Sequence, residues 1–79
     1  MKTIQIEYFA ILRERAGVAA EEVSTHATTP SGIYVELQTR YEFPDQATMK
    51  VAVNDEFSAW DAALNDGDRL VFIPPVAGG

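Results

Sequence analysis

The sequence predicts one α+β domain in which a mixed β-sheet packs against one main helix. Apolar segments typical of strands lie near both ends of the chain, over residues 2–9 and 69–73. The one long stretch with helical spacing lies between them, over residues 30–42. The remaining segments are short strands separated by turn residues. A chain of 79 residues has the size of one small domain.

The first element is a strand over residues 2–9, because apolar and polar side chains alternate along it. The side chains that we expect on its core face are Ile4, Ile6 and Tyr8. From Phe9 onwards the spacing becomes helical, which predicts a short helix over residues 10–16 with Gly17 as its stop. Residues 20–26 alternate weakly and predict an edge strand antiparallel to the first.

The main helix has a clear start signal. Thr29 is suited to cap the helix and Pro30 to occupy its first position. The apolar side chains that follow at helical spacing are Ile33, Tyr34, Leu37 and Tyr41. This single stripe predicts packing against a sheet, and the helix should end near Phe43-Pro44.

Turn residues divide the second half of the chain. Residues 45–50 predict a loop, and residues 51–58 predict a hairpin with Asn54-Asp55 at its turn. A short helical turn is expected over residues 61–64. A tight turn over residues 65–68, in which Gly67 is free to adopt positive φ, then leads into the last strand.

The first and last strands are expected to pair in parallel, because a helical crossover joins them. This arrangement is the β-grasp, or ubiquitin-like, architecture. We expect residues 1–75 to form the β-grasp domain and residues 76–79 to form a flexible Gly-Gly tail.

Composition excludes several classes of function. Six basic and twelve acidic residues give a net charge of −6, which argues against nucleic-acid binding and suits a basic partner surface. The absence of cysteine excludes disulfides and thiolate chemistry on the chain. No apolar run approaches the roughly 18–20 residues of a membrane span, and no signal-peptide pattern is present, so we expect a cytoplasmic protein without membrane contact.

No metal site or enzyme active site is predicted on this chain. His26 is the only histidine, and no nucleophile or carboxylate lies at the spacing of a triad or metal site. Asp66 and Asp68 flank Gly67 as in a calcium loop, but the other ligand positions of such a loop are missing. Trp60 is expected to pack against the core.

The last six residues are the most informative segment: Pro74, Pro75, Val76, Ala77, Gly78 and Gly79. Two terminal glycines arise by chance in about one chain in 200. The prolines should direct the tail away from the domain, and glycines without Cβ can enter a narrow channel. The four residues after Pro75 reach about 13–14 Å when extended. The alternative is a frayed terminus without function.

A terminal carboxylate is a poor electrophile and is ionised at pH 7. It needs activation before acyl chemistry, and an acyl-adenylate made from ATP is the usual form. Either sulfur or an amine can then attack the adenylate.

A second candidate site is an apolar docking face. In residues 70–73 every side chain is apolar, so both faces of this strand would be apolar. In a sheet covered by one helix, the outer face is normally solvated. Ile73 is one candidate for this outer face. Phe9 has the parity opposite to the core positions of the first strand, and Phe57 follows the hairpin turn. We expect Phe9, Phe57 and Ile73 to form one face beside the tail; the alternative is a second small core beneath the loops.

Five segments resemble the family of small, sulfur-carrying subunits of molybdopterin synthase, which are ThiS/MoaD-like β-grasp proteins. They are residues 9–17 (FAILRERAG), 29–41 (TPSGIYVELQTRY), 51–56 (VAVNDE), 64–68 (LNDGD) and 71–79 (VFIPPVAGG). The last segment is the most specific. The chain would then not be an enzyme on its own, but the sulfur-donating subunit of a synthase.

The resemblance implies that a ubiquitin-activating-like adenylyltransferase uses ATP to adenylate Gly79, and that a sulfur donor protein converts the adenylate to a thiocarboxylate. The tail then enters the large synthase subunit and gives its sulfur to cyclic pyranopterin monophosphate. A heterotetramer of two small and two large subunits is implied, and no cofactor is bound by this chain. The implied reactive residues are Gly79 and Gly78, and the implied partner-binding residues are Phe9, Phe57, Ile73, Pro74, Pro75, Val76 and Ala77.

Other functions remain open at the level of sequence. The chain could carry sulfur for thiamine synthesis or tRNA thiolation, because those relatives also end in Gly-Gly. A ubiquitin-like modifier that forms isopeptides is a third possibility, and an interaction module with an irrelevant tail is a fourth.

Overall fold

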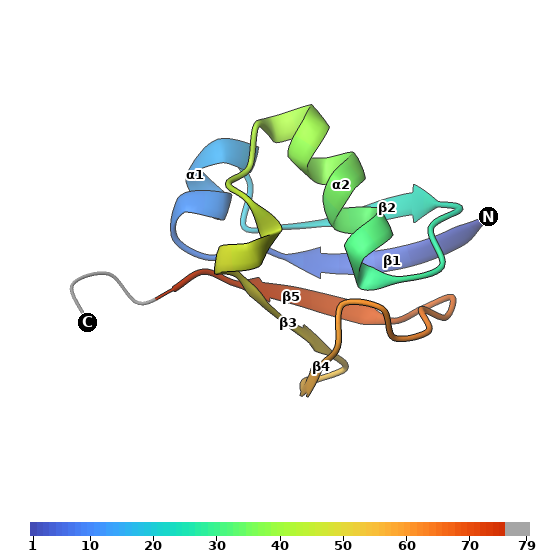
Figure 1. Cartoon of the computed structure of the whole chain (residues 1–79). Coiled ribbons are helices and arrows are strands. Elements are labelled where there is room, and N and C mark those ends of the chain that lie inside the picture. The colour runs from blue at the N-terminus through green and yellow to red at the C-terminus, as the bar shows by residue number, and fades with distance from the viewer. Residues whose placement is uncertain (76–79) are drawn as a thin grey trace.

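The computed structural model describes residues 1–75, which form a five-stranded sheet with both helices on one face (Figure 1). The strands are β1 (Lys2–Glu7), β2 (Ala20–Thr25), β3 (Lys50–Val53), β4 (Glu56–Ser58) and β5 (Arg69–Ile73). The helices are α1 (Ile11–Ala16) and α2 (Pro30–Tyr41), with a 3₁₀ turn, η1, at Gln46–Thr48. The strand order is β2-β1-β5-β3-β4.

The first and last strands lie side by side at the centre of the sheet. β1 and β5 are parallel, with Ile6 opposite Leu70. The other three pairs, β1–β2, β3–β4 and β3–β5, are antiparallel. The sheet is therefore mixed, and the predicted β-grasp fold is confirmed.

The core lies between the sheet and α2. Thr29 accepts a hydrogen bond from the Gly32 backbone N–H at 3.1 Å, and Pro30 occupies the first turn, as predicted. The helix ends at Tyr41, where Glu42 adopts a left-handed conformation with φ 58°. The fully buried side chains that meet between the layers are Ile4, Leu12, Ile33, Tyr34, Leu37, Leu70 and Phe72.

The tight turn before β5 also holds the start of β1. Gly67 adopts φ 87°, and its N–H donates to the Thr3 carbonyl at 2.8 Å. The Thr3 N–H donates to the Asp66 carboxylate at 2.7 Å, and the Gln5 N–H donates to the Asp68 carbonyl at 3.0 Å. These bonds set the register of the parallel pair.

The hairpin turn is of the two-residue type. Asn54 and Asp55 have φ of 52° and 72°, as a type I′ turn requires. The Asn54 side chain donates to one oxygen of the buried Asp68 carboxylate, and the Asn65 N–H donates to the other. Both oxygens of the Asp68 carboxylate therefore accept hydrogen bonds from the two neighbouring turns. These bonds give Asp68 a structural role in the turn beside Gly67.

Two local predictions were wrong. Residues 45–50 are not a plain loop, because the Asp45 carboxylate caps η1 by accepting from the Ala47 N–H at 2.9 Å. The helical turn predicted over residues 61–64 is misplaced, because the Ala62 N–H donates to the Ala59 carbonyl at 3.2 Å and the turn lies over residues 59–62. The Leu64 N–H instead donates to the Thr28 carbonyl at 2.9 Å, which ties this segment to the loop before α2.

Trp60 packs against the core, as predicted. Its ring stacks on Phe72, with centroids 5.9 Å apart and an interplanar angle of 6°. The edge contact with Tyr34 has a centroid distance of 5.5 Å. Trp60 thereby closes the end of the core near the loop that leads into α2.

All three tyrosines are tied to the fold by their hydroxyl groups. Tyr8 and Tyr41 both donate to the same oxygen of Glu21, which joins β1, β2 and α2. Tyr34 donates to the Pro44 carbonyl at 2.7 Å. Burial, followed by the Glu21 carboxylate, raises the pKa of Tyr8 and Tyr41, and burial raises the pKa of Tyr34 to about 12.

These raised pKa values predict that stability falls in alkaline solution. An unfolded tyrosine ionises near pH 10. Between that pH and the higher native pKa values, the folded state holds protons that the unfolded state has lost. The free energy of unfolding should therefore decrease as pH rises above about 10. Tyrosinate absorbance should show native tyrosines titrating above those of the urea-unfolded chain, and coincident titrations would contradict this.

Candidate functional site

The sheet face opposite α2 has a polar half and an apolar half. One row of neighbours across all five strands, in spatial order, is Ala20, Glu7, Val71, Ala52 and Phe57. On the β1–β2 side, Gln5 donates to the Glu22 carboxylate at 2.7 Å. On the β5–β3–β4 side, the row is apolar, so an apolar surface lies beside the end of β5.

β5 has apolar side chains on both faces, and the structure assigns each set to a face. Leu70 and Phe72 are fully buried beneath α2. Val71 and Ile73 lie on the opposite face and are partly exposed. The prediction that one set faces the main helix and the other faces outwards is confirmed.

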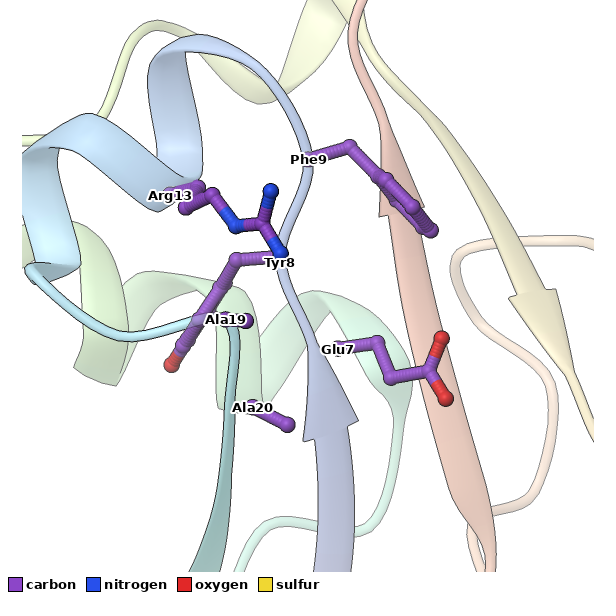
Figure 2. Close-up of a pocket in the computed structure, with 6 residues that line it drawn as sticks. All are labelled: Glu7, Tyr8, Phe9, Arg13, Ala19 and Ala20. Carbon is purple, nitrogen blue, oxygen red and sulfur yellow. The ribbon is translucent and has the colours of Figure 1, made fainter.

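The two phenylalanines named from the sequence are exposed. Phe57 is 75% exposed and lies opposite Ala52, and Phe9 is 47% exposed just after the end of β1. In Figure 2, Phe9 and Glu7 extend toward β5, whereas Tyr8 extends to the other side. We call Phe9, Ala52, Phe57, Val71 and Ile73 the outer apolar face. This placement disfavours a second small core, and docking at the face stays a prediction.

Three residues of this region were missed from the sequence. Val71 shares the parity of Ile73, so the alternation of β5 could have identified it. Ala52 and Lys50 share one parity on β3, but only the pairing of β3 with β5 brings them to this face. No signal in the sequence specified that pairing.

A groove of about 300 Å³ lies where β5 ends. It is lined by Thr48, Lys50, Ile73, Pro74 and Pro75. The Lys50 ammonium lies 5.9 Å from the centroid of the Phe57 ring, so a cation borders the outer apolar face. Pro74 and Pro75 leave the sheet beside this groove. The predicted site residues Val76, Ala77, Gly78 and Gly79 lie outside the described residues.

A second hollow of about 270 Å³ lies beside the end of β1 (Figure 2). Its lining is Glu7, Tyr8, Phe9, Arg13, Ala19 and Ala20. The Tyr8 hydroxyl is engaged with Glu21, so it is not available to a molecule in the hollow. The hollow therefore offers one carboxylate and one guanidinium, without a paired nucleophile and base.

Residues 1–75 contain no group of three or more His, Cys, Asp or Glu side chains arranged to hold a metal ion. His26 is exposed just after β2, as predicted. None of the helices within these residues is both long and apolar enough to cross a membrane.

Comparison with known proteins identifies the family. The ThiS family matches residues 6–79. The chain belongs to the ThiS family. It is 35% identical to the molybdopterin synthase sulfur carrier subunit of Mycobacterium tuberculosis over 83 residues, covering 100% of both chains. It is 30% identical to the Escherichia coli protein of the same name, covering 96% of this chain and 99% of that protein.

Several solved structures are similar to this chain over nearly its whole length. A putative molybdopterin converting factor subunit 1 from Pyrococcus furiosus has a TM-score of 0.80 at 30% identity, covering 96% of this chain and 100% of that one. SAMP1 from Haloferax volcanii has a TM-score of 0.79 at 27% identity, with coverages of 98% and 99%. A chain in the BexX/CysO complex of Amycolatopsis orientalis has a TM-score of 0.69 at 26% identity, with coverages of 96% and 99%.

In this ThiS-family chain, a strained turn presents Phe9. The Leu12 N–H donates to the Phe9 carbonyl at 3.1 Å, and Ala10 between them has φ 51° and ψ −125°. These angles belong to the second position of a type II′ turn, which favours glycine. Ala10 therefore holds an unfavourable conformation next to the outer apolar face.

We predict that Ala10→Gly stabilises the fold by about 1 kcal/mol. Removing about 1–3 kcal/mol of strain outweighs the added entropy of the unfolded chain, about 0.4–1 kcal/mol. Gly17→Ala is the matched control with the opposite sign. Gly17 has φ 78°, and an added Cβ meets nothing within 4 Å, so strain alone should destabilise the protein. Urea unfolding measures both, and a destabilised Ala10→Gly protein would contradict the strain.

Proposed function

We propose that this chain is the sulfur carrier of a molybdopterin synthase, with the sulfur held at the carboxyl group of Gly79. The observation that carries the proposal is the match to named sulfur carrier subunits over nearly the full length of each chain. The family match also extends to residue 79, so it includes both glycines of the tail. The described domain supplies a surface beside the root of this tail.

In the proposed cycle the reactive atoms belong to Gly79 and to partner proteins. The carboxylate attacks the α-phosphate of ATP in a ubiquitin-activating-like enzyme, and pyrophosphate leaves. A sulfur supplied by a donor protein at the oxidation level of sulfide attacks the carbonyl carbon of Gly79, the bond to AMP breaks, and the thiocarboxylate is produced. In the large synthase subunit, the sulfur passes to cyclic pyranopterin monophosphate, and an oxygen from water restores the carboxylate. This chain binds no cofactor in the cycle, and ATP is used by the activating enzyme.

The outer apolar face is proposed to seat the domain on the large subunit. Phe57 and Phe9 are large exposed side chains, and aromatic residues are frequent anchors at interfaces. Seating this face would orient Pro74 and Pro75 so that the tail enters the partner's channel. Two small and two large subunits form the proposed synthase, and the proposed location is the cytoplasm.

A second candidate is a ubiquitin-like modifier. The likeness to SAMP1, which is named a small archaeal modifier protein, favours it. An amine of a target lysine would then attack the activated Gly79, and an isopeptide bond would form in place of the thiocarboxylate. Sulfur carriage for thiamine synthesis or tRNA thiolation would use the same thiocarboxylate with a different acceptor.

Mass spectrometry of the protein from cells separates these functions. A carrier gains about 16 Da when sulfur replaces a carboxylate oxygen, whereas a modifier appears in adducts of much higher mass. Deletion of Gly79 should abolish adenylation and sulfur transfer, because it moves the carboxyl group by about 3.3–3.6 Å and misplacement by 1 Å can cost about a hundredfold in rate. The melting temperature should hardly change. Sulfur transfer by the deletion variant would refute the proposal.

The docking proposal predicts that Phe57→Ala or Ile73→Ala weakens binding to the large subunit at least about tenfold, as loss of an interface anchor does. Calorimetric titration of the folded variants measures this. Val35→Ala is the matched control, since Val35 is 53% exposed on α2, away from the face. Phe72→Ala should instead unfold the domain, at a cost of about 3–5 kcal/mol. Normal binding by Phe57→Ala and Ile73→Ala would exclude the face as the docking site.

A further inference from the structure

The groove at the root of the tail contains a cation that the proposed docking must cover. Lys50 begins β3 and lies opposite Ile73, the last residue of β5. Its ammonium lies over the Phe57 ring, 5.9 Å from the centroid. The other lining residues of the groove are Thr48, Pro74 and Pro75. One charged group therefore lies between the apolar face and the two prolines that lead to the tail.

The Lys50 ammonium has no hydrogen-bond or ion-pair partner among residues 1–75. Across residues 1–75, no carboxylate oxygen lies within 4.0 Å of it, and no hydrogen bond to a described group is formed by its amine. The Phe57 ring covers one side by a cation–π contact. An ammonium group has three donors, so the side away from the ring is left to water in the isolated domain.

Docking would change the solvation of this ammonium. A partner seated on the outer apolar face beside the root of the tail would contact Pro74 and Pro75, and these residues share the groove with Lys50. Covering an ammonium without an acceptor carries a large desolvation penalty. A carboxylate is the strongest acceptor that a protein side chain offers to an ammonium.

We propose that Lys50 forms an ion pair with an Asp or Glu of the large synthase subunit, and that this pair sets the orientation of the domain at the mouth of the tail channel. The inference rests on the proposed function. The large subunit is the occupant to which we assign the groove, because the named relatives are subunits of a synthase and a subunit interface desolvates its polar groups. The groove holds about 300 Å³, enough for one such side chain and its neighbours.

The charge pattern of the chain supports a role in specificity. The net charge of −6 attracts a basic partner surface at long range, without choosing one orientation. A single cation within such a surface requires one acidic group at one place on the partner. Any orientation that puts a basic group against Lys50 is then disfavoured by repulsion.

The test measures binding of the full chain to the large subunit by titration calorimetry. Lys50→Met keeps an apolar chain over Phe57 and removes the charge, and it should weaken binding at least about tenfold. Lys50→Arg should bind within about threefold of the unchanged protein, because the charge is kept. Lys50→Glu should be the weakest of the three. Each variant should unfold at the temperature of the unchanged protein, because the Lys50 side chain is exposed.

Lys2→Glu is the matched control for net charge. It makes the same charge change as Lys50→Glu, at the N-terminal start of β1, at the opposite end of the sheet from Pro74 (Figure 1). Its binding should change less than about threefold if the effect of Lys50 is local. Equal weakening by Lys2→Glu and Lys50→Glu would overturn the ion pair, because the loss of binding would then not depend on where the cation lies.

A carbodiimide provides a direct assay, since it joins an amine to a carboxylate as an amide and takes up the water that is lost. Cross-linked peptides of the complex should join Lys50 to an Asp or Glu of the large subunit. Cross-links from Lys50 only to this chain's own carboxylates, or unaltered binding by Lys50→Met, would overturn the inference. If Lys50 proves to have no such role and Phe57→Ala still weakens binding, the outer apolar face is supported as the docking site and only the proposed ion pair of Lys50 is refuted. Sulfur carriage is tested separately by the mass of Gly79.

Discussion

The parallel pairing of β1 with β5 is the constraint on which the rest of this domain depends. Parallel strands cannot be joined by a tight turn, so the chain between them must cross over the sheet. α2 makes that crossover and buries its apolar stripe on Leu70 and Phe72. The turn at Asp66 and Gly67 bonds to Thr3 and fixes the register from the other end. Loss of that register would displace every side chain of β5 relative to the helix.

A small chain with one main helix can bury only one face of its sheet. The described domain spends its large apolar side chains between α2 and the sheet, where the aromatic rings of Tyr34, Trp60 and Phe72 contact one another. The opposite face remains open. It is polar over β1 and β2, whereas Val71, Ala52 and Phe57 form an apolar row over β5, β3 and β4 that the Lys50 ammonium borders. Such an uneven surface is suited to binding one partner in one orientation.

The strand that leads to the tail is also the centre of the sheet. β5 is the central strand of the sheet, with a neighbouring strand on each side, and it leads directly into Pro74 and Pro75. The docking surfaces that we propose, the outer apolar face and Lys50, lie on β5 and its neighbours. A partner that binds them receives the tail from a fixed starting point. Under the proposed function, this arrangement would let partner proteins act on Gly79 while the domain supplies the binding surface.

Much of this fold could be predicted from local patterns. Alternation indicated β1, and a short apolar run after a turn indicated β5. Thr29 and Pro30 marked the start of α2, and Asn54-Asp55 marked the hairpin, because capping and turn geometry depend on a few neighbouring residues. The errors at residues 45–50 and 61–64 arose where a side-chain cap or a distant carbonyl decided the conformation.

For the candidate site too, some features follow from local sequence and others depend on contacts between distant segments. The Gly-Gly tail, the net charge of −6 and the outward placement of Phe9 and Ile73 could be read from the chain alone, since they follow from composition and from the side-chain period of a strand. The positions of Ala52 beside Val71 and of Lys50 over Phe57, at the root of the tail, became known from the folded structure. Those neighbours come from strands whose pairing is set by packing across the whole sheet, and no local pattern specifies such pairing.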